Sequence, residues 1–230
     1  MLDDLRREVC QANRSLVEAG LVRLTFGNAS GIDSRRELVV IKPSGVPYGD
    51  LTPEQMVVVD LEGNVVEGSL RPSTDTPTHL LLYRHFESIG GITHAHSRFA
   101  TMFAQARREI PCLGTTHADH FQGPVPVTRP LTQGEVERAY EANTARVIIE
   151  RFEQLDHTVM PAVLVAGHGP FTWGSDVTES LNNAVALETV AEMALGTRLI
   201  RADAPELEAH LVSKHHRRKH GSDAYYGQDA

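Results

Sequence analysis

The first residues of the chain alternate between apolar and polar positions with the period of an amphipathic helix. Leu5, Val9 and Leu16 recur at helical spacing, which places their side chains on one face of a helix. Gly20 follows the last of these turns, and glycine commonly ends helices. The pattern predicts a helix over residues 3–19.

The period changes after this helix. The runs LVRLTFGNASGID, ELVVIKPSG and QMVVVDLEGNVVEG are short, rich in β-branched residues and separated by Gly, Pro and Asn. This pattern is typical of β-strands joined by turns. Residues 62–64, with the sequence EGN, predict a hairpin turn. Further strands are expected over residues 89–96 and 161–169.

Helical periodicity returns in the middle of the chain. The segment STDTPTH places Pro77 just after a cluster of Ser, Thr and Asp residues, which is a signal for a helix start. Ser97 is expected to cap the next helix, RFATMFAQARR. Two longer helices are predicted over residues 134–155 and from about Asp176 to Leu199, the second beginning with a capping-box pattern.

These elements predict an α/β protein with a mixed, mainly antiparallel sheet flanked by helices. No internal repeat or linker divides the 230 residues, so we expect one domain over residues 1–230. The last stretch, KHHRRKHGSDAYYGQDA, is polar, basic and aromatic, and we expect it to form a tail.

Composition excludes several classes of protein. A hydrophobic content of 41% is ordinary for a globular chain, while a net charge of -8 argues against nucleic-acid binding and against docking on an anionic membrane. The N-terminus lacks the apolar core of a signal peptide, and no apolar run approaches the length of a membrane span. Cys10 and Cys112 form neither a disulfide framework nor a zinc-binding spacing. We therefore expect a reduced, cytoplasmic protein.

Three histidines are candidates for a metal site. His94 and His96 lie one residue apart in a predicted strand, so both side chains point to the same face. His168 lies at the end of another predicted strand, between glycines, where the backbone can come close to a ligand. Asp75 could complete a set of three histidines and one carboxylate, which suits Zn²⁺ or another divalent ion such as Mn²⁺. A chain with 12 histidines also produces such pairs by chance, and the patterns of metallo-β-lactamases and cupins are not met.

Three turn segments are candidates for anion binding. FGNASG, KPSG and RPST, at residues 26–31, 42–45 and 71–74, are rich in backbone donors, hydroxyls and amides. Donors of this kind bind anions, especially next to a helix N-terminus. Each segment alone is more often a simple turn, but all three lie close in sequence to the candidate metal ligands. Together they favour a phosphorylated substrate.

Seven segments together resemble the class II aldolase and L-ribulose-5-phosphate 4-epimerase family, over essentially the whole chain. They are LTFGNASGID, IKPSGV, PSTDTPTH, HAHS, GTTHADHF, AGHGPFTWG and the terminal KHHRRKHGSDAYYGQ. The resemblance implies an α/β/α-layered fold around an antiparallel sheet. It also implies a homotetramer with fourfold symmetry, active sites at subunit interfaces, and a C-terminal tail, about residues 213–230, that contributes to them.

The resemblance assigns roles to residues by position. It implies that the three histidines and Asp75 bind the metal. It implies substrate binding by Gly27, Asn28, Lys42, Ser44, Gly45, Ser73, Thr74 and His215. Asp119 and Tyr226 match the acid/base pair of the epimerases, whereas the aldolases typically have a glutamate at the position of Asp75. The chain departs from the family pattern at His120, where a tyrosine is more usual.

The implied reaction is the metal-dependent epimerisation of L-ribulose 5-phosphate at C4, which gives D-xylulose 5-phosphate. The C4 hydrogen is not acidic, so the C3–C4 bond must break and re-form, and a divalent ion would stabilise the resulting enediolate. Asp119 and Tyr226 would exchange protons with the C4 oxygen from an adjacent subunit, for which the pKa of Asp119 should be raised. Two alternatives stay open: a class II sugar-phosphate aldolase of the L-fuculose 1-phosphate type, and a catalytically silent metal-binding protein on the same fold.

Overall fold

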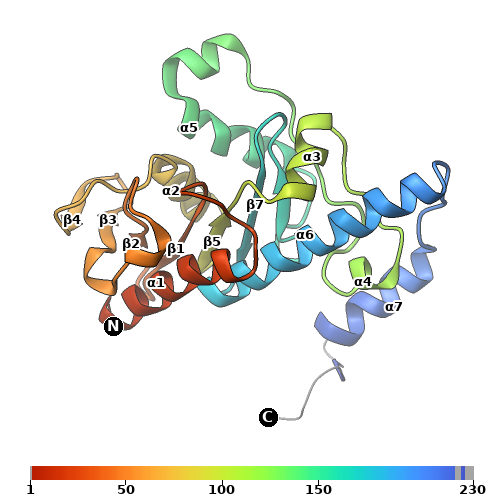
Figure 1. Ribbon diagram of the computed structural model, residues 1–230, viewed down its shortest axis with the longest axis horizontal. Helices are drawn as coiled ribbons and strands as arrows, with labels where there is room; N and C mark the ends of the chain where they lie inside the picture. The colour runs from red at the N-terminus through yellow and green to blue at the C-terminus, as the bar shows by residue number, and fades with distance from the viewer. Residues whose placement is uncertain (1, 221–223, 226–230) are drawn as a thin grey trace.

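A single antiparallel sheet forms the centre of the molecule (Figure 1). The computed structural model describes residues 2–220 and 224–225. Within them, seven strands lie in the order β4-β3-β2-β1-β5-β7-β6, and every neighbouring pair is antiparallel. The strands are β1 Asn28–Ile32, β2 Leu38–Ile41, β3 Val57–Asp60, β4 Val65–Glu67, β5 Gly91–His94, β6 Ala162–Leu164 and β7 Pro170–Gly174. The predicted α/β class with a mainly antiparallel sheet is confirmed.

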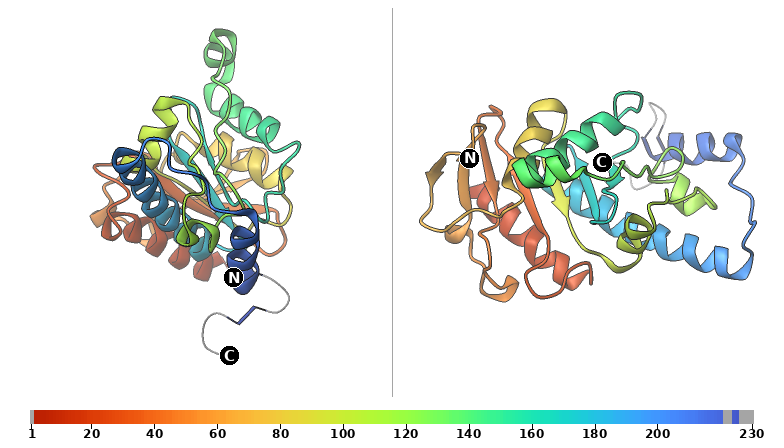
Figure 2. Two further views of the ribbon diagram at one scale, coloured as in Figure 1. Left: turned by 90° about the vertical axis from the view of Figure 1, so that its right-hand side faces the viewer. Right: turned by 90° about the horizontal axis from the view of Figure 1, so that it is seen from above.

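Helices cover both faces of the sheet. They are α1 Leu2–Glu18, α2 Thr76–His85, α3 Arg98–Ala106, α4 Thr115–Ala118, α5 Gln133–Arg151, α6 Val177–Ile200 and α7 Ala209–His220, with 3-10 turns at Tyr48–Asp50 and Pro53–Gln55. Helices α1 and α6 lie on one face, and α2 and α5 lie on the other (Figure 2). None of the helices in the described part of the chain has the length and apolarity that a membrane span requires.

Alternating valines on the central strands place one hydrophobic cluster on each face. Side chains of successive residues in a strand point to opposite faces. Val39 and Val59 accordingly belong to the cluster under α2 and α5, while Val40 and Val58 belong to the cluster under α1. All four are fully buried. The sequence runs that appeared uniformly apolar are therefore strands with both faces buried.

A row of glycines lets α6 pack directly on the sheet. Gly31, Gly91 and Gly174 lie side by side on β1, β5 and β7. A Cβ atom on Gly31 would lie 2.5 Å from Val177, and one on Gly174 would lie 2.6 Å from Glu179. Because no side chain separates the helix from these strands, the start of β5, three residues before His94, packs directly against the start of α6.

The C-terminal segment differs from the prediction. Residues 209–220 form helix α7, although the sequence pattern predicted a polar tail from about residue 214. The helix packs on α4 largely through polar groups, since Asp119 accepts hydrogen bonds from His215 and Arg218. A hydrophobic period does not reveal a helix whose contacts are polar.

Two helix starts were predicted from capping patterns, and one of them differs. Ser97 occupies the N-cap position of α3 without a side-chain capping bond. Glu188 of α6 instead accepts hydrogen bonds from the backbone N–H groups of Phe99 and Ala100, at 2.8 and 3.0 Å. At the start of α6, Asp176 does cap the helix by accepting from the Glu179 N–H at 2.7 Å. The cap of α3 thus comes from a residue about 90 positions away.

Candidate active site

Three histidines converge where β5 ends and where β6 turns into β7. His94 is the last residue of β5, His96 follows it two positions later, and His168 lies in the turn between β6 and β7. One ring nitrogen from each lies within 4.8 Å of the others. The Nε2 atoms of His94 and His96 are 3.2 Å apart. The structure therefore brings together the three histidines that the sequence proposed as metal ligands.

The histidines are in the form that binds metals. Burial lowers the pKa of His94 and His96, and it lowers the pKa of His168 to about 3. The three imidazoles are therefore neutral at pH 7, with lone pairs available to a cation. The Nδ1 atom of His94 is 2.8 Å from the Pro170 carbonyl oxygen, to which its N–H donates a hydrogen bond, so the Nε2 lone pair is available to a metal. This donor set fits a divalent ion.

Asp75 lies beside the histidines and is oriented by Asn28. It occupies the N-cap position of α2 but makes no capping bond there. Its Oδ2 atom accepts a hydrogen bond from the Asn28 amide at 2.7 Å, and the same amide contacts the Ser73 hydroxyl at 3.0 Å. Burial tends to raise the pKa of Asp75, but His94 and the Asn28 amide, among others, outweigh it and hold this pKa below its usual value. The group of ligand atoms within 4.8 Å contains the three histidines and not Asp75.

Hydrogen bonds join the three candidate anion-binding loops. The Asn28 amide donates to the Ser73 hydroxyl at 3.0 Å, and the hydroxyl of Tyr48, just beyond segment 42–46, donates to the carbonyl oxygens of Phe26 and Gly27, each at 2.7 Å. The Ser44 N–H donates to the Arg71 carbonyl oxygen at 2.9 Å, and the Ser73 N–H donates to the Lys42 carbonyl oxygen at the same distance. Segments 26–28, 42–46 and 71–75 consequently form one surface.

This surface and the histidines line one cavity of about 320 Å³. Its walls include Thr25, Phe26, Gly27, Asn28, Lys42, Pro43, Ser44, Gly45, Ser73, Thr74, Asp75, His94, His96 and His168. The cavity therefore contains all four predicted metal ligands and seven of the eight predicted substrate-binding residues. Lys42 also has a structural contact, because its buried Nζ donates to the Val46 carbonyl oxygen at 2.9 Å.

Asp119 and His215 lie elsewhere, where α4 packs on α7 (Figure 1). Arg218 binds the Asp119 carboxylate with two hydrogen bonds of 2.8 and 2.6 Å, and the Nδ1 atom of His215 lies 3.0 Å from it. Burial tends to raise the pKa of Asp119, but these partners outweigh it and lower this pKa. The expectation of a raised pKa was wrong for the single chain. Tyr226 lies outside the described residues.

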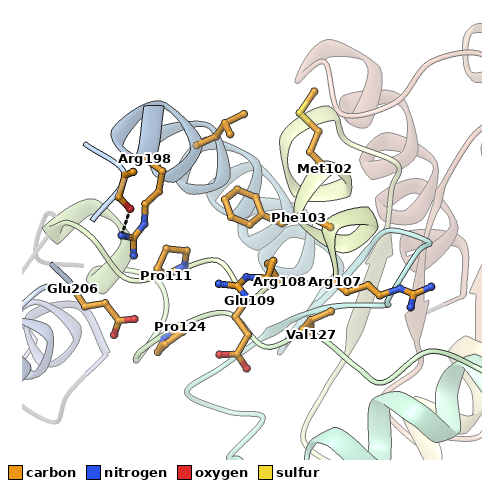
Figure 3. Close-up of a pocket in the computed structure, with 13 residues that line it drawn as sticks. Met102, Phe103, Arg107, Arg108, Glu109, Pro111, Pro124, Val127, Arg198 and Glu206 are labelled. Carbon is orange, nitrogen blue, oxygen red and sulfur yellow. Dashed lines mark hydrogen bonds between the residues drawn. The ribbon is translucent and has the colours of Figure 1, made fainter. Parts of the chain in front are cut away.

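A larger cavity of about 720 Å³ lies between α3, the C-terminal half of α6 and the loops near residues 111 and 124 (Figure 3). Met102 and Phe103 form part of its apolar lining, while Arg198, Glu109 and Glu206 bring charges of both signs. Arg198 donates to the Ala202 carbonyl oxygen at 2.8 Å. No residue of this lining belongs to the histidine cavity, so the larger cavity contains none of the candidate metal ligands or substrate loops.

Two aromatic residues near the histidines were not predicted. The Phe26 ring is half exposed at the cavity edge, 6.1 Å from the ring of His96. The Tyr140 hydroxyl lies 3.2 Å from the Nδ1 atom of His168. An aromatic side chain within a turn was an available signal for Phe26. Tyr140 gave no comparable signal, because it lies in a polar helix.

Comparison with known proteins decides the family. Residues 7–195 match the class II aldolase and adducin N-terminal domain. The chain belongs to this family. The match spans most of the 230 residues and includes the three histidines and the three loops of the cavity.

Solved structures agree with this membership. An L-fuculose 1-phosphate aldolase is 28% identical, with a TM-score of 0.79 over 94% of this chain and 95% of that chain. YgbL from Klebsiella pneumoniae, a putative aldolase/epimerase/decarboxylase, is 26% identical, with a TM-score of 0.71 over 93% and 98% of the two chains. An L-fuculose-1-phosphate aldolase from Thermus thermophilus is 27% identical, with a TM-score of 0.70 over 88% and 99%.

The class II aldolase fold expected from the sequence is thereby confirmed. Enzymes of this superfamily are aldolases and epimerases that use a divalent ion, usually Zn²⁺, and act on sugar phosphates. The histidine cluster provides a group of side chains that could bind such an ion.

Proposed function

We propose that this protein epimerises L-ribulose 5-phosphate at C4 to give D-xylulose 5-phosphate. The observation that carries the proposal is the single cavity that combines three neutral histidines with three donor-rich loops. Its volume of about 320 Å³ is at the lower end of the range for small-molecule sites. A five-carbon sugar phosphate is a ligand of suitable size and chemistry.

The histidines and Asp75 would hold a divalent ion, which we take to be Zn²⁺. When bound, this ion supplies Lewis-acid chemistry that stabilises negative charge on the sugar oxygens as the C3–C4 bond breaks. Neutral imidazole ligands leave most of the positive charge available for that task. Asn28 keeps the Asp75 carboxylate in place through the 2.7 Å hydrogen bond.

The loops would bind the rest of the substrate. The hydroxyls of Ser44, Ser73 and Thr74 and nearby backbone N–H groups line the cavity and can donate hydrogen bonds to a phosphate. The Oδ1 atom of Asn28 is buried and has no hydrogen-bond partner among the described residues. Because such an atom is costly to leave unpaired, we assign it to a hydroxyl group of the sugar.

The choice of an epimerase over an aldolase depends on Asp75 and Asp119. Asp75 has a shorter side chain than the glutamate base typical of the aldolases, and Asn28 already occupies one of its oxygens. Asp119 and Tyr226 would instead exchange protons with the C4 oxygen. Since Asp119 does not line the cavity of its own chain, it would act in the site of a second copy, as expected for a homotetramer.

The first test follows L-ribulose 5-phosphate with zinc-loaded protein by NMR, for wild type, His96→Ala and Tyr226→Phe. Formation of D-xylulose 5-phosphate by wild type, with a loss of about 100-fold or more in both variants, supports the proposal. Release of an aldehyde from L-fuculose 1-phosphate without epimerisation would replace it with the aldolase activity. Zinc binding with no turnover on either substrate would indicate a silent metal-binding protein.

A mixing experiment tests whether two copies share each site. His96→Ala removes a metal ligand, and Asp119→Asn removes the proposed acid from a different surface. If each site uses groups from two subunits, co-refolded mixtures of these inactive variants regain part of the activity. Activity that stays absent in mixed oligomers contradicts a shared site.

A further inference from the structure

His94 and His168 differ in what holds the outer nitrogen of the ring, which is the nitrogen that would not bind the metal. His94 donates from Nδ1 to a backbone carbonyl oxygen, that of Pro170. His168 lies between Gly167 and Gly169, and Gly167 has a φ of 76°. A histidine flanked by glycines has no side chains on its neighbours in the chain to restrict its ring. The hydrogen-bonding group next to its Nδ1 atom is the hydroxyl of Tyr140, at 3.2 Å.

A break in α5 places Tyr140 at this point. Ala139 has φ −165° and ψ 75°, so the helical conformation is interrupted just before Tyr140. Asn143 spans the break by donating from its side-chain amide to the Glu135 carbonyl oxygen at 2.8 Å. On the far side of the break, Thr78 of α2 donates to the Glu141 carbonyl oxygen at 2.7 Å. Residues of two helices therefore fix the backbone on both sides of this tyrosine.

The contact has a chemical consequence for His168. When Nδ1 carries the proton and donates a hydrogen bond to the Tyr140 hydroxyl oxygen, Nε2 retains its lone pair. Histidine ligands of metals generally have such a partner for the outer nitrogen, and its loss commonly lowers metal affinity by about 10–100-fold. The Tyr140 side chain is 36% exposed, so removal of its hydroxyl does not create a cavity in the core.

We propose that Tyr140 is a positioning residue that fixes the ring orientation and tautomer of His168 for metal binding. This inference rests on the metal site of the proposed function but does not depend on which sugar phosphate reacts. It assigns to the break in α5 the role of placing a phenol beside the metal ligands. Tyr140 acts through His168 and does not itself bind the ion.

The test measures Zn²⁺ affinity by competition with a chelating dye, for wild type, Tyr140→Phe and Ser88→Ala. Ser88 serves as the control because its hydroxyl lies 2.8 Å from the Nε2 atom of His157, and neither residue lines the histidine cavity. We expect Tyr140→Phe to weaken zinc binding by about 10–100-fold, with an unchanged unfolding midpoint of the metal-free protein. The Ser88→Ala affinity should match that of wild type.

A second readout separates positioning from a general loss of structure. With Co²⁺ in place of Zn²⁺, Tyr140→Phe should alter the visible absorption bands, since these report ligand geometry. Equal affinity and identical spectra for Tyr140→Phe and wild type would overturn the inference, as would failure of the wild-type protein to bind zinc. Tight zinc binding by wild type without turnover would count against the proposed function alone, and the inference about Tyr140 would stand.

Discussion

Substitution of Gly27 by alanine tests whether the substrate loop and the metal strand are packed as the structure shows. Gly27 has a φ of 84°, and a Cβ atom placed on it would lie 2.6 Å from the His94 carbonyl oxygen. Left-handed backbone costs a residue other than glycine about 1–2 kcal/mol. Carbon–oxygen contacts normally exceed about 3.3 Å, so the loop or the end of β5 must also move by about 0.7 Å.

The expected cost follows from these two contributions. Overpacking against a rigid neighbour adds about 1–3 kcal/mol, so Gly27→Ala should lower the free energy of unfolding by about 2–5 kcal/mol. Gly20 provides the matched control, because its φ is 71° and nothing lies within 4 Å of its added Cβ. Gly20→Ala should therefore cost only the backbone contribution of about 1–2 kcal/mol.

Urea unfolding of the metal-free proteins measures both values, and dye competition measures zinc affinity. Since binding groups must be held within about 0.5 Å of their productive positions, Gly27→Ala should also weaken zinc binding, whereas Gly20→Ala should not. Equal destabilisation by the two substitutions, with zinc affinity unchanged in both, would refute the close approach of the loop to His94.

Three further predictions concern stability. Arg36 donates from Nη1 to the Ile89 carbonyl oxygen, beyond α2, and from Nη2 to the Tyr83 carbonyl oxygen, near the end of α2, each at 2.7 Å. Arg36→Ala should therefore lower the free energy of unfolding by about 2–4 kcal/mol in urea. Arg36→Gly should cost about 1 kcal/mol less, because φ is positive at this position. An alanine variant as stable as wild type would contradict this. Burial lowers the pKa of His117 to about 4, below its unfolded value near 6.5. The unfolded chain therefore binds the proton first, and His117 should account for about 2 kcal/mol of the stability that the metal-free protein loses between pH 7 and pH 5. Parallel pH profiles for wild type and His117→Gln would exclude that contribution. Finally, Zn²⁺ at about 100 times its Kd should stabilise wild type by about 2.7 kcal/mol, and thermal unfolding of His96→Ala should show no comparable shift.

The sequence was sufficient for the parts of the fold that follow from local periodicity. Short runs of valine predicted strands, and the hairpin turn at residues 62–64 is present between β3 and β4, where Gly63 has a positive φ. The helices over residues 134–155 and from about Asp176 to Leu199 also lie close to their predicted ranges. Strand β7 was not predicted, because PFTWG directly follows a turn and is too short to show a period.

The candidate site was predicted in its components more than in its arrangement. Strand geometry predicted that His94 and His96 share a face, but β5 ends at His94 and His96 lies just beyond it. The glycines around His168 marked it as a third candidate. The hydrogen bond from Asn28 to Asp75 joins residues 47 positions apart, and no local pattern encodes such a contact. The same holds for Arg218, which lies 99 positions from Asp119 and helps to reverse the expected direction of its pKa shift.

The amino-acid sequence by itself determined where the backbone extends, turns or coils, and which residue types are available as ligands, because these depend on neighbours within a few positions. Only the tertiary structure decided which side chains meet. It placed Tyr140 of the interrupted α5 beside His168, turned the expected tail into α7 through polar contacts with α4, and kept Asp119 out of the histidine cavity. These outcomes depend on how helices pack on the sheet, which fixes distances between residues that are far apart in the chain.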